Sequence, residues 1–307
     1  MDRFEAMSLL VAVSDAGSFS AASRALKVPL ATLSRKVGEL ETLLGARVLM
    51  RTTRRLALTD AGLAYVAAAR RILEQVEEAE REVAGEFTSP KGQLVITAPV
   101  MFGRRHVLPL VAEFLADFPH IDVRLLLADR NLHLAEDHVD MAVRIGALPD
   151  SALVATRIGT MRLVTCASPA LLAGHGAPAR PEALGAWPCV AFDMPSAPPG
   201  WRFREPETGA ILDIPVRPRL SVTTTEAALD AALRGIGVVR LLQYQVAEAV
   251  ARRELKLLLE EFEPEPAPVH LIHAARGQMP LKMRRFLDLA APRLRTTLAR
   301  LAETGLP

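Results

Sequence analysis

The sequence predicts an α/β protein with a mostly helical N-terminal part and a C-terminal part made of two α/β lobes. Residues 17–59 combine two short helical patterns with a basic hairpin, and residues 60–87 keep one long heptad pattern. From residue 94 onward, strand and helix patterns alternate, which is typical of parallel sheets covered by helices. The 307 residues are enough for about two domains with a sizeable core.

The N-terminal segment predicts three consecutive helices. Residues 2–14 keep helical spacing in their apolar side chains and predict the first. Gly17 can end it, because glycine adopts the left-handed backbone conformation without steric cost. Ser18 or Ser20 can cap the second helix by accepting a bond from an unpaired backbone N–H. Pro29 ends that second helix, since proline cannot continue it, and a third helix follows.

The third helix, which Gly45 ends, has two different faces. Its apolar stripe follows spacings of four, three and four: Leu33, Val37, Leu40 and Leu44. Its opposite face carries small or hydrogen-bonding side chains and two cations: Ala31, Thr32, Ser34, Arg35 and Lys36. A helix that enters a DNA major groove needs a first turn that approaches base edges closely and flanks that meet phosphate. This face therefore predicts groove contacts.

A basic β-hairpin is predicted directly after this helix. Alternating apolar residues bracket the stretch from Arg51 to Arg55. Between Arg24 and Arg55, eight basic minus two acidic residues leave an excess of six positive charges, whereas the whole chain carries +2. Such focused charge is what phosphate binding requires. A solvated basic surface without a ligand is the alternative, but the basic run coincides with the helix pair and the hairpin.

Thr59 and Asp60 are expected to cap a long helix that reaches about residue 87. Its apolar residues recur at alternating spacings of four and three: Tyr65, Ala69, Ile72, Val76, Ala79 and Val83. One narrow apolar seam on a long charged helix implies a partner helix, because an isolated helix of this kind is poorly stable. The pattern therefore predicts that two chains pair.

The composition of residues 88–92 predicts a hinge. The order strand, helix, strand, helix, strand that follows it predicts a parallel sheet. The expected elements of this first lobe are a strand at 94–97, a helix at 103–116, a strand at 121–127, a helix at 132–137 and a strand at 140–146. A second lobe is expected from about residue 161, with strands in LVTCA, CVAF and RLSV, helices at 225–233 and 244–253, and a strand at 255–259. A strand at 269–272 and a helix at 281–298 return to the first lobe.

Ligands of open α/β sheets bind outside the carboxyl ends of the strands. This rule selects Thr97, Pro99, Val100, Ala128, Arg144, Thr223 and Thr224 as ligand-binding candidates. Threonine hydroxyls and helix N-terminal N–H groups suit an anion, with Arg144 as countercharge. Helix capping accounts equally well for Thr97 and Thr223, and a structural ion pair with Asp129 or Asp140 accounts for Arg144.

Several other classes of protein lack support in the sequence. No apolar run reaches the ~18 residues of a membrane span, and no signal-peptide pattern opens the chain, so a cytoplasmic protein without a membrane partner is expected. Cys166 and Cys189 lie in apolar, strand-like runs, where buried core residues are favoured over a redox switch. No catalytic constellation, metal-ligand spacing, phosphate loop or dinucleotide fingerprint stands out, so neither an enzyme nor a cofactor is expected.

The N-terminal segment resembles the winged helix–turn–helix of LysR-type transcriptional regulators. The matching residues are Phe4, the GSFSAASRAL helix, Leu33-Ser34-Arg35, Leu40-Glu41 and RTTRRLALTDAG. Pro29-Leu30 departs from the Ser-Pro order common in that family. The stretches QLVITAPVMFGRRHVLP, VDMAVRIG and AALRGIGVVRLL resemble the effector domain of the same family, which has a periplasmic-binding-protein-like fold. Leu241-Leu242-Gln243 departs from the Leu-Pro often found there.

The resemblance implies a sequence-specific regulator that binds interrupted palindromic promoter sites as a homodimer or homotetramer. Its domains would be a DNA-binding domain at 1–59, a linker helix and hinge at 60–90, and an effector domain at 91–300 (lobe I about 91–160 and 269–300, lobe II about 161–268). A small-molecule effector would bind in the two-lobed cleft. The implied DNA-binding residues are Ser20, Arg24, Ala31, Thr32, Ser34, Arg35, Lys36, Arg51, Thr53, Arg54 and Arg55. The alternative is a cytoplasmic solute-binding or sensory module whose N-terminal region serves assembly only.

Overall fold

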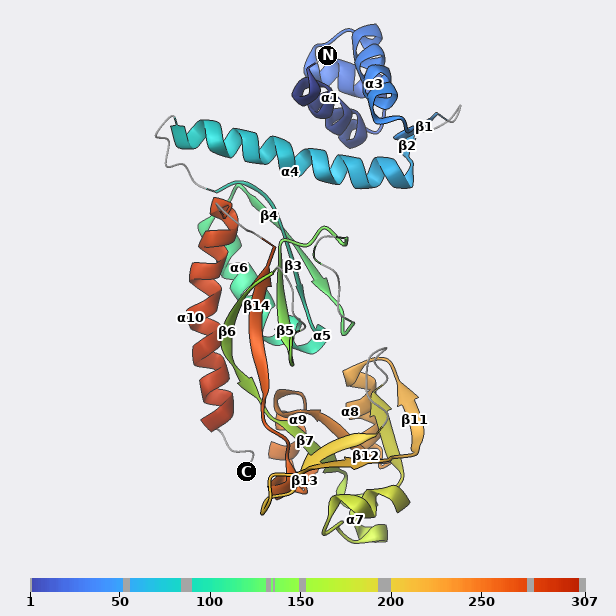
Figure 1. Ribbon diagram of the computed structural model, residues 1–307, viewed down its shortest axis with the longest axis vertical. Coiled ribbons are helices and arrows are strands. Elements are labelled where there is room, and N and C mark those ends of the chain that lie inside the picture. The colour runs from blue at the N-terminus through green and yellow to red at the C-terminus, as the bar shows by residue number, and fades with distance from the viewer. Residues whose placement is uncertain are drawn as a thin grey trace. The chain divides into compact units, whose positions relative to one another are not determined.

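The chain forms two compact units, Met1–Ser89 and Pro90–Pro307 (Figure 1). The computed structural model describes residues 2–51, 56–83, 90–130, 134, 136–148, 153–192, 200–274 and 279–303. The predicted α/β class is confirmed, with a helical first unit and a second unit that contains two five-stranded sheets.

The first unit consists of four helices and one small hairpin among its described residues. These elements are α1 (Arg3–Ala16), α2 (Phe19–Leu26), α3 (Leu30–Leu44), β1 (Leu49–Arg51), β2 (Leu56–Leu58) and α4 (Asp60–Val83). Gly17 and Gly45 end α1 and α3 with φ of 65° and 64°, as predicted. Ser18, and not Ser20, caps α2 by accepting a hydrogen bond from the Ala21 N–H at 3.1 Å. The core of this unit gathers residues of α1 and α3 around Leu10, Leu33 and Leu40.

The long helix α4 uses part of its apolar seam within the chain. Ala69 is fully buried and Tyr65 is half-buried against the core of the first unit, where α4 packs on α1. Leu63 and Ile72 remain 58% and 36% exposed. The predicted continuation to residue 87 lies outside the described residues. The seam therefore does not serve a partner helix along its whole length, and one apolar side chain within it, Ile72, and one outside it, Leu63, remain exposed.

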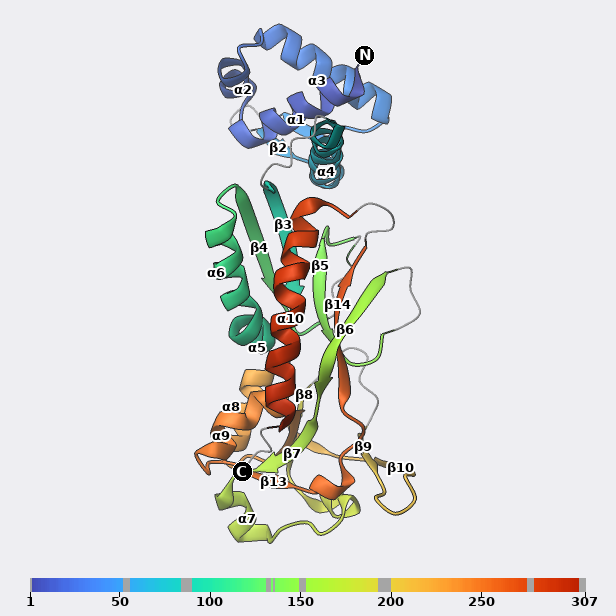
Figure 2. The same ribbon diagram turned by 90° about the vertical axis from the view of Figure 1, so that its left-hand side faces the viewer.

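Lobe I of the second unit is a mixed sheet with helices on one face. Its strands are β3 (Gly92–Ala98), β4 (Ile121–Leu127), β5 (Met141–Ile145), β6 (Val154–Met161) and β14 (Ala267–His273), in the order β4-β3-β5-β14-β6. β3 runs parallel to β4 and β5, whereas β14 is antiparallel to β5 and β6. The helices are α5 (Val100–Phe102), a π-helical turn (Gly103–Val107), α6 (Leu108–Asp117) and α10 (Leu281–Glu303) (Figure 2).

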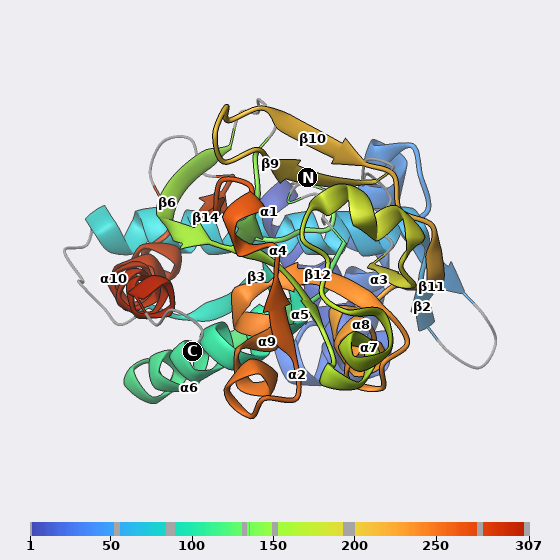
Figure 3. The same ribbon diagram turned by 90° about the horizontal axis from the view of Figure 1, so that it is seen from below.

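Lobe II is a second mixed sheet, in the order β11-β8-β12-β7-β13. Its strands are β7 (Leu163–Ala167), β8 (Cys189–Phe192), β11 (Pro218–Val222), β12 (Val238–Leu242) and β13 (Lys256–Leu258). Helices α8 (Thr225–Leu233) and α9 (Gln243–Ala251) cover one face. The separate hairpin of β9 (Trp201–Arg204) and β10 (Ile211–Ile214) lies on the other face, with α7 (Pro169–His175) and the short helices Pro181–Ala186 and Glu260–Phe262 nearby (Figure 3).

Several predicted elements differ from the structure. The first helix of lobe I begins at Val100 rather than at Gly103, because Pro99 starts it directly at the end of β3. The described part of residues 132–137 forms turns instead of a helix. The sheet of lobe I is not wholly parallel, since β14 is inserted antiparallel between β5 and β6. The β9–β10 hairpin, β6 and α7 were not predicted.

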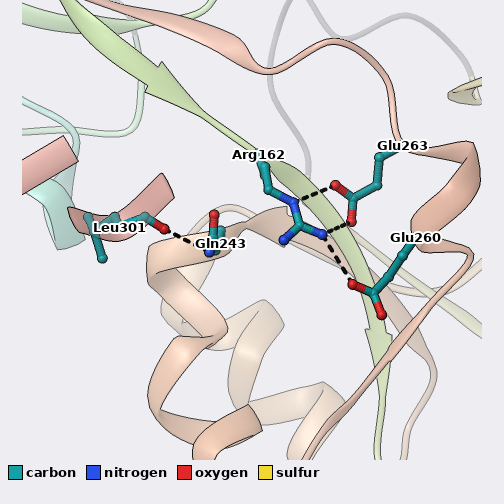
Figure 4. A network of polar contacts seen from close by, with 5 residues as sticks. All are labelled: Arg162, Gln243, Glu260, Glu263 and Leu301. Carbon is teal, nitrogen blue, oxygen red and sulfur yellow. Dashed lines mark hydrogen bonds and ion pairs between the residues drawn. The ribbon is translucent and has the colours of Figure 1, made fainter. Parts of the chain in front are cut away.

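Two chain crossings connect the lobes, and a side-chain network joins these crossings. Arg162 is the single residue between β6 and β7, and its Nε and Nη2 hold the two carboxylate oxygens of Glu263 at 2.8 Å each. Glu260 accepts a further hydrogen bond from Nη2 at 3.2 Å. Gln243 donates a hydrogen bond from Nε2 to the Leu301 carbonyl at 2.9 Å (Figure 4). Arg162 therefore ties the two crossings to each other.

The two cysteines are core residues, as predicted. Cys166 and Cys189 are both completely buried and unpaired in lobe II. Burial raises the pKa of the Cys166 thiol to about 12 and that of the Cys189 thiol to about 11.

We therefore expect both thiols to resist alkylation in the folded protein. At pH 8 the reactive thiolate is scarcer than in a free cysteine by a factor of roughly a hundred to a few thousand. Iodoacetamide at pH 8, followed by mass spectrometry, should leave both cysteines unmodified over an hour, whereas the same treatment in 8 M urea should modify both. Native modification of either residue at the rate of a free thiol would contradict their burial.

Within the described residues, no single helix is both long and apolar enough to cross a membrane. The one pair of helices that reaches that length and composition together, α1 with α2, is bent by 117°.

Candidate functional site

The exposed face of α3 is the first candidate site. Leu33, Val37 and Leu40 point into the core, so the opposite face is turned outward. Ala31 in the first turn is exposed, and the side chain of Arg35, one turn later, is 62% exposed. Pro29 precedes the helix and no side chain caps its first N–H groups. An uncapped helix N-terminus beside small side chains suits close approach to an anionic ligand.

The other candidates on α2 and α3 have different surroundings. Ser20 and Arg24 are exposed on α2, whereas Thr32 and Ser34 are half-buried on α3. Arg35 forms an ion pair with Glu39 one turn later on the same helix. The Lys36 side chain is only 20% exposed and forms an ion pair with Glu5 of α1. A shallow groove along α3 is lined by Arg35, Lys36, Glu39, Thr42 and Leu43.

The hairpin is attached to α3 by a carboxylate. One oxygen of Glu41 accepts hydrogen bonds from the N–H groups of Val48 and Leu49 at 2.9 and 3.1 Å. The Thr59 hydroxyl donates to the Arg47 carbonyl at 2.8 Å and accepts from the Gly62 N–H at 2.9 Å. Thr53, Arg54, Arg55 and the side chain of Arg51 lie outside the described residues. Sequence reasoning assigned no role to Glu41, which positions the base of the hairpin.

The second candidate site lies where the carboxyl ends of β3 and β4 meet the N-terminus of α8. One oxygen of Asp129 accepts a hydrogen bond from the Val100 N–H at 3.0 Å. The other lies 3.5 Å from both the backbone nitrogen and the hydroxyl of Thr225. The Asp129 carboxylate itself occupies the helix N-terminal positions that were predicted to hold an anion.

The predicted threonines at this site have partners within the protein. The Thr97 hydroxyl is fully buried and donates to the Leu126 carbonyl at 2.9 Å. Thr224 caps α8 by accepting a hydrogen bond from the Ala227 N–H at 3.3 Å. Pro99, Val100 and Ala128 are half-buried around this position, and Thr223 is exposed. Thr97 thus stabilises the sheet edge and does not cap a helix.

Arg144 is 8% exposed at the end of β5. Burial lowers the pKa of its guanidinium, and the nearby charge of Asp137 acts in the opposite direction. Asp140, one of the two carboxylates considered for it, accepts a hydrogen bond from the Val95 N–H at 2.8 Å.

A π-helical turn brings a further group of side chains to the contact between the lobes. Arg105 donates from Nη1 to the Tyr244 carbonyl at 2.7 Å. The Tyr244 ring, from α9 of lobe II, is buried in the core of lobe I, edge-on to Phe102 with ring centroids 5.5 Å apart. The His106 ring lies 5.7 Å from the same tyrosine, and burial lowers its pKa. A π-helical turn contains one residue more than an α-helical turn, and no sequence pattern indicates it. The contact of this turn with Tyr244 was therefore not predicted.

Comparison with known proteins identifies what these two units are. Residues 4–63 match the family described as "Bacterial regulatory helix-turn-helix protein, lysR family", and residues 88–295 match the "LysR substrate binding domain". The chain belongs to the LysR family. It is therefore a DNA-binding transcriptional regulator with an effector-binding domain.

Relatives of this LysR-type chain extend over nearly its whole length. An HTH-type transcriptional regulator of Xanthomonas campestris pv. campestris is 35% identical over 289 residues, which cover 93% of this chain and 84% of that protein. The solved structure of CrgA, a LysR-type regulator of Neisseria meningitidis, is 32% identical with a TM-score of 0.59, over 96% of this chain and 99% of that chain. The full-length Vibrio cholerae virulence activator AphB shares the fold at 24% identity, with a TM-score of 0.59 over 94% and 98% of the two chains.

The two sites of this LysR-type regulator differ in how many of their polar groups already have a hydrogen-bond partner within the protein. On α3 the first-turn N–H groups have no side-chain cap and the Arg35 side chain is largely exposed. Between the lobes, the hydroxyls of Thr97 and Thr224 and the carboxylate of Asp129 all bond within the protein. No group of three or more metal-ligating side chains occurs in the described part of the chain.

Proposed function

We propose that this LysR-type regulator binds interrupted palindromic promoter sites through the exposed face of α3. The observation that carries the proposal is the first turn of α3, which combines uncapped N–H groups with exposed Ala31 and with Arg35 one turn away. Small side chains let this turn approach base edges, and Arg35 can donate to guanine. Ser20 and Arg24 would hold phosphate, and the groove lined by Arg35 and Lys36 would follow the DNA backbone.

The full set of proposed DNA-binding residues stays as predicted, with Thr32, Ser34, Arg51, Thr53, Arg54 and Arg55 beside those named above. Exposed Leu30 at the start of α3 is a further candidate, since an apolar side chain there can contact a thymine methyl group. Lys36 would first exchange its partner Glu5 for phosphate.

We further propose that two chains pair through α4 and through the apolar side chains that remain exposed on this helix. Leu63 and Ile72 support this pairing because they are large, apolar and 58% and 36% exposed. Pairing gives two α3 helices that can reach half-sites about 34 Å apart. A dimer of dimers is the assembly we expect. The proposed division is a DNA-binding domain at 1–59, a linker helix and hinge at 60–90, and an effector domain at 91–300.

A small molecule bound between the lobes would then change the regulator's affinity for DNA or the spacing of its paired α3 helices on the DNA. It can do so only by binding one lobe arrangement better than another. We propose that the chain performs this role as a non-enzyme in the cytoplasm, where it meets chromosomal DNA.

The proposal is tested by capturing genomic DNA with the purified full-length chain at several salt concentrations. Enrichment of a short interrupted palindrome, weakening with salt but not vanishing at about 0.15 M, is the expected result. Weak, uniform binding that salt abolishes would instead favour the sensory-module alternative.

Replacing Arg35 with alanine should weaken binding to the selected site by about 1–3 kcal/mol and relax the base preference at one position in each half-site. Arg124→Ala is the matched control, because it removes the same charge from an exposed strand residue of the effector domain. Titration of labelled site DNA should show a loss of about fivefold or more for Arg35→Ala and none for Arg124→Ala. Equal effects of the two variants would remove Arg35 from base recognition.

A further inference from the structure

Arg240 on β12 is a half-buried cation, and two of its three guanidinium nitrogens have no hydrogen-bond partner within the described structure. Its Nε and Nη2 atoms are inaccessible to solvent and have no hydrogen-bond partner among the described residues. The guanidinium carbon lies 4.4 Å from the ring centroid of Phe203 and 5.9 Å from that of Trp201, both on β9. Burial lowers the Arg240 pKa to about 10. A buried guanidinium without hydrogen-bond partners is costly, so a missing partner is indicated.

The two unused nitrogens form one edge of the guanidinium. Nε–H and the neighbouring Nη2–H point in parallel and together match the two oxygens of a carboxylate. Arg162 at the crossing between the lobes shows this arrangement, because its Nε and Nη2 hold the two oxygens of Glu263 at 2.8 Å each. Glu263 also acts on Arg240 through its charge, but its oxygens are already engaged by Arg162. The edge of Arg240 is therefore shaped for a second carboxylate that these contacts do not supply.

We propose that Arg240 holds the carboxylate group of the small-molecule effector through its Nε and Nη2 edge. This inference rests on the proposed effector function and specifies the ligand class. The position expected from the sequence for an anion is filled by Asp129, which accepts from Val100 and lies against Thr225. An effector carboxylate must therefore either displace Asp129 or bind elsewhere, and Arg240 offers two donors without that competition.

The surroundings of Arg240 favour a monocarboxylate over phosphate. Phe203 is 1% exposed and Trp201 is partly buried beside the guanidinium, so the position is lined by aromatic side chains. Transferring a second negative charge into such surroundings is more costly than transferring one. The cover is the β9–β10 hairpin, a separate two-stranded sheet not hydrogen-bonded to the main sheet of lobe II. The hairpin is held to lobe II by the buried side chains of Phe203 and Ile214 rather than by strand pairing, so a ligand that reaches Arg240 must displace these side chains in part.

The test uses sodium acetate as the probe and the thermal unfolding of the full chain as the readout. Acetate should raise the Tm of the wild-type protein above that in sodium chloride of equal ionic strength, by roughly 2–4 °C at saturation. Arg240→Met should abolish this rise, and Arg240→Lys, which keeps the charge but loses the planar edge, should weaken acetate binding at least fivefold. Arg202→Met is the matched control, because Arg202 is exposed on β9 and pairs with Asp213 at 3.1 Å; it should keep the full response.

The same variants separate a ligand site from a structural arginine. Without acetate, Arg240→Met should unfold at the same temperature as the wild type or higher, since it removes two buried nitrogens that lack a hydrogen-bond partner. A lower Tm for Arg240→Met, an acetate response that survives in it, or a larger Arg240-dependent response to inorganic phosphate than to acetate would overturn the proposal. Capture of promoter DNA by the wild-type chain is measured in parallel. If the chain captures DNA but does not respond to acetate, only this inference is contradicted. If the chain responds to acetate but does not capture DNA, only the DNA-binding proposal is contradicted.

Discussion

Replacing Gly62 with alanine should release the hairpin from α4 and abolish promoter binding. A Cβ atom at Gly62 would lie 2.0 Å from the carbonyl oxygen and 2.8 Å from the carbonyl carbon of Val48. Both atoms belong to the backbone, and the Val48 carbonyl also accepts the Thr59 N–H at 3.1 Å. The clash can be relieved only by moving the first turn of α4 away from β1. We expect the first unit to lose about 3 kcal/mol of stability, as in severe overpacking.

Hydrogen exchange of peptides covering residues 46–66 would measure this loss where it occurs, and titration of promoter DNA would measure its consequence. Gly38→Ala is the matched control, because a Cβ built at that position on α3 meets no atom within 4 Å apart from its chain neighbours and the backbone of its own helix. It should leave exchange unchanged or slow it, since alanine favours a helix over glycine by about 1 kcal/mol. Wild-type exchange rates in Gly62→Ala would show that the Val48 contact is not as close as described.

Removing Arg162 should destabilise the effector domain more than removing any exposed arginine of lobe II. Arg162 is 26% exposed in its side chain and Glu263 only 12%, so Arg162→Ala leaves a nearly buried carboxylate without its main partner. Breaking such a pair from one side costs about 3 kcal/mol or more. The Glu263 contacts raise the pKa of Arg162, which agrees with a pair that stabilises the charged form.

Urea unfolding followed by the fluorescence of Trp187 and Trp201 would measure the effect, because both residues lie in lobe II. Arg202→Ala provides the comparison: its side chain and that of Asp213 are 61% and 67% exposed, and such pairs contribute about 0–1 kcal/mol. Replacing Arg162 and Glu263 together by Met and Leu should recover part of the loss, since no buried charge then stays unpaired. A loss for Arg162→Ala no larger than that for Arg202→Ala would show that the connection between the crossings carries little stability.

Local signals in the sequence predicted the elements that depend on neighbouring residues. Gly17 and Gly45 end helices where expected, β4 spans Ile121–Leu127 as predicted, and α8 spans Thr225–Leu233 as predicted. In each case a capping residue or a short apolar run determines the boundary within the segment itself. The α/β class and the LysR assignment followed from many such signals in order.

Contacts between distant segments could not be predicted in this way. Nothing near Asp129 indicates that its carboxylate meets both Val100 and Thr225, which lie 29 and 96 residues away. Arg240 reads as one residue of an apolar strand, and its environment depends on a hairpin that the sequence pattern did not predict. The candidate residues on α3 were accessible to sequence reasoning because one helix carries most of them, whereas the site between the lobes is assembled from the ends of β3, β4 and β5 and the start of α8.

The position of β14 in the sheet of lobe I has a consequence for synthesis on the ribosome. β14 lies between β5 and β6, although about a hundred residues of lobe II separate it from β6 in the chain. Until Ala267–His273 has been translated, β6 has no strand to pair with in lobe I. Lobe II emerges complete in the meantime, which takes on the order of ten seconds at usual elongation rates. The nascent chain should therefore acquire its second lobe first, with one edge of β5 and the edges of β6 open to chaperones or to wrong pairing until β14 leaves the exit tunnel.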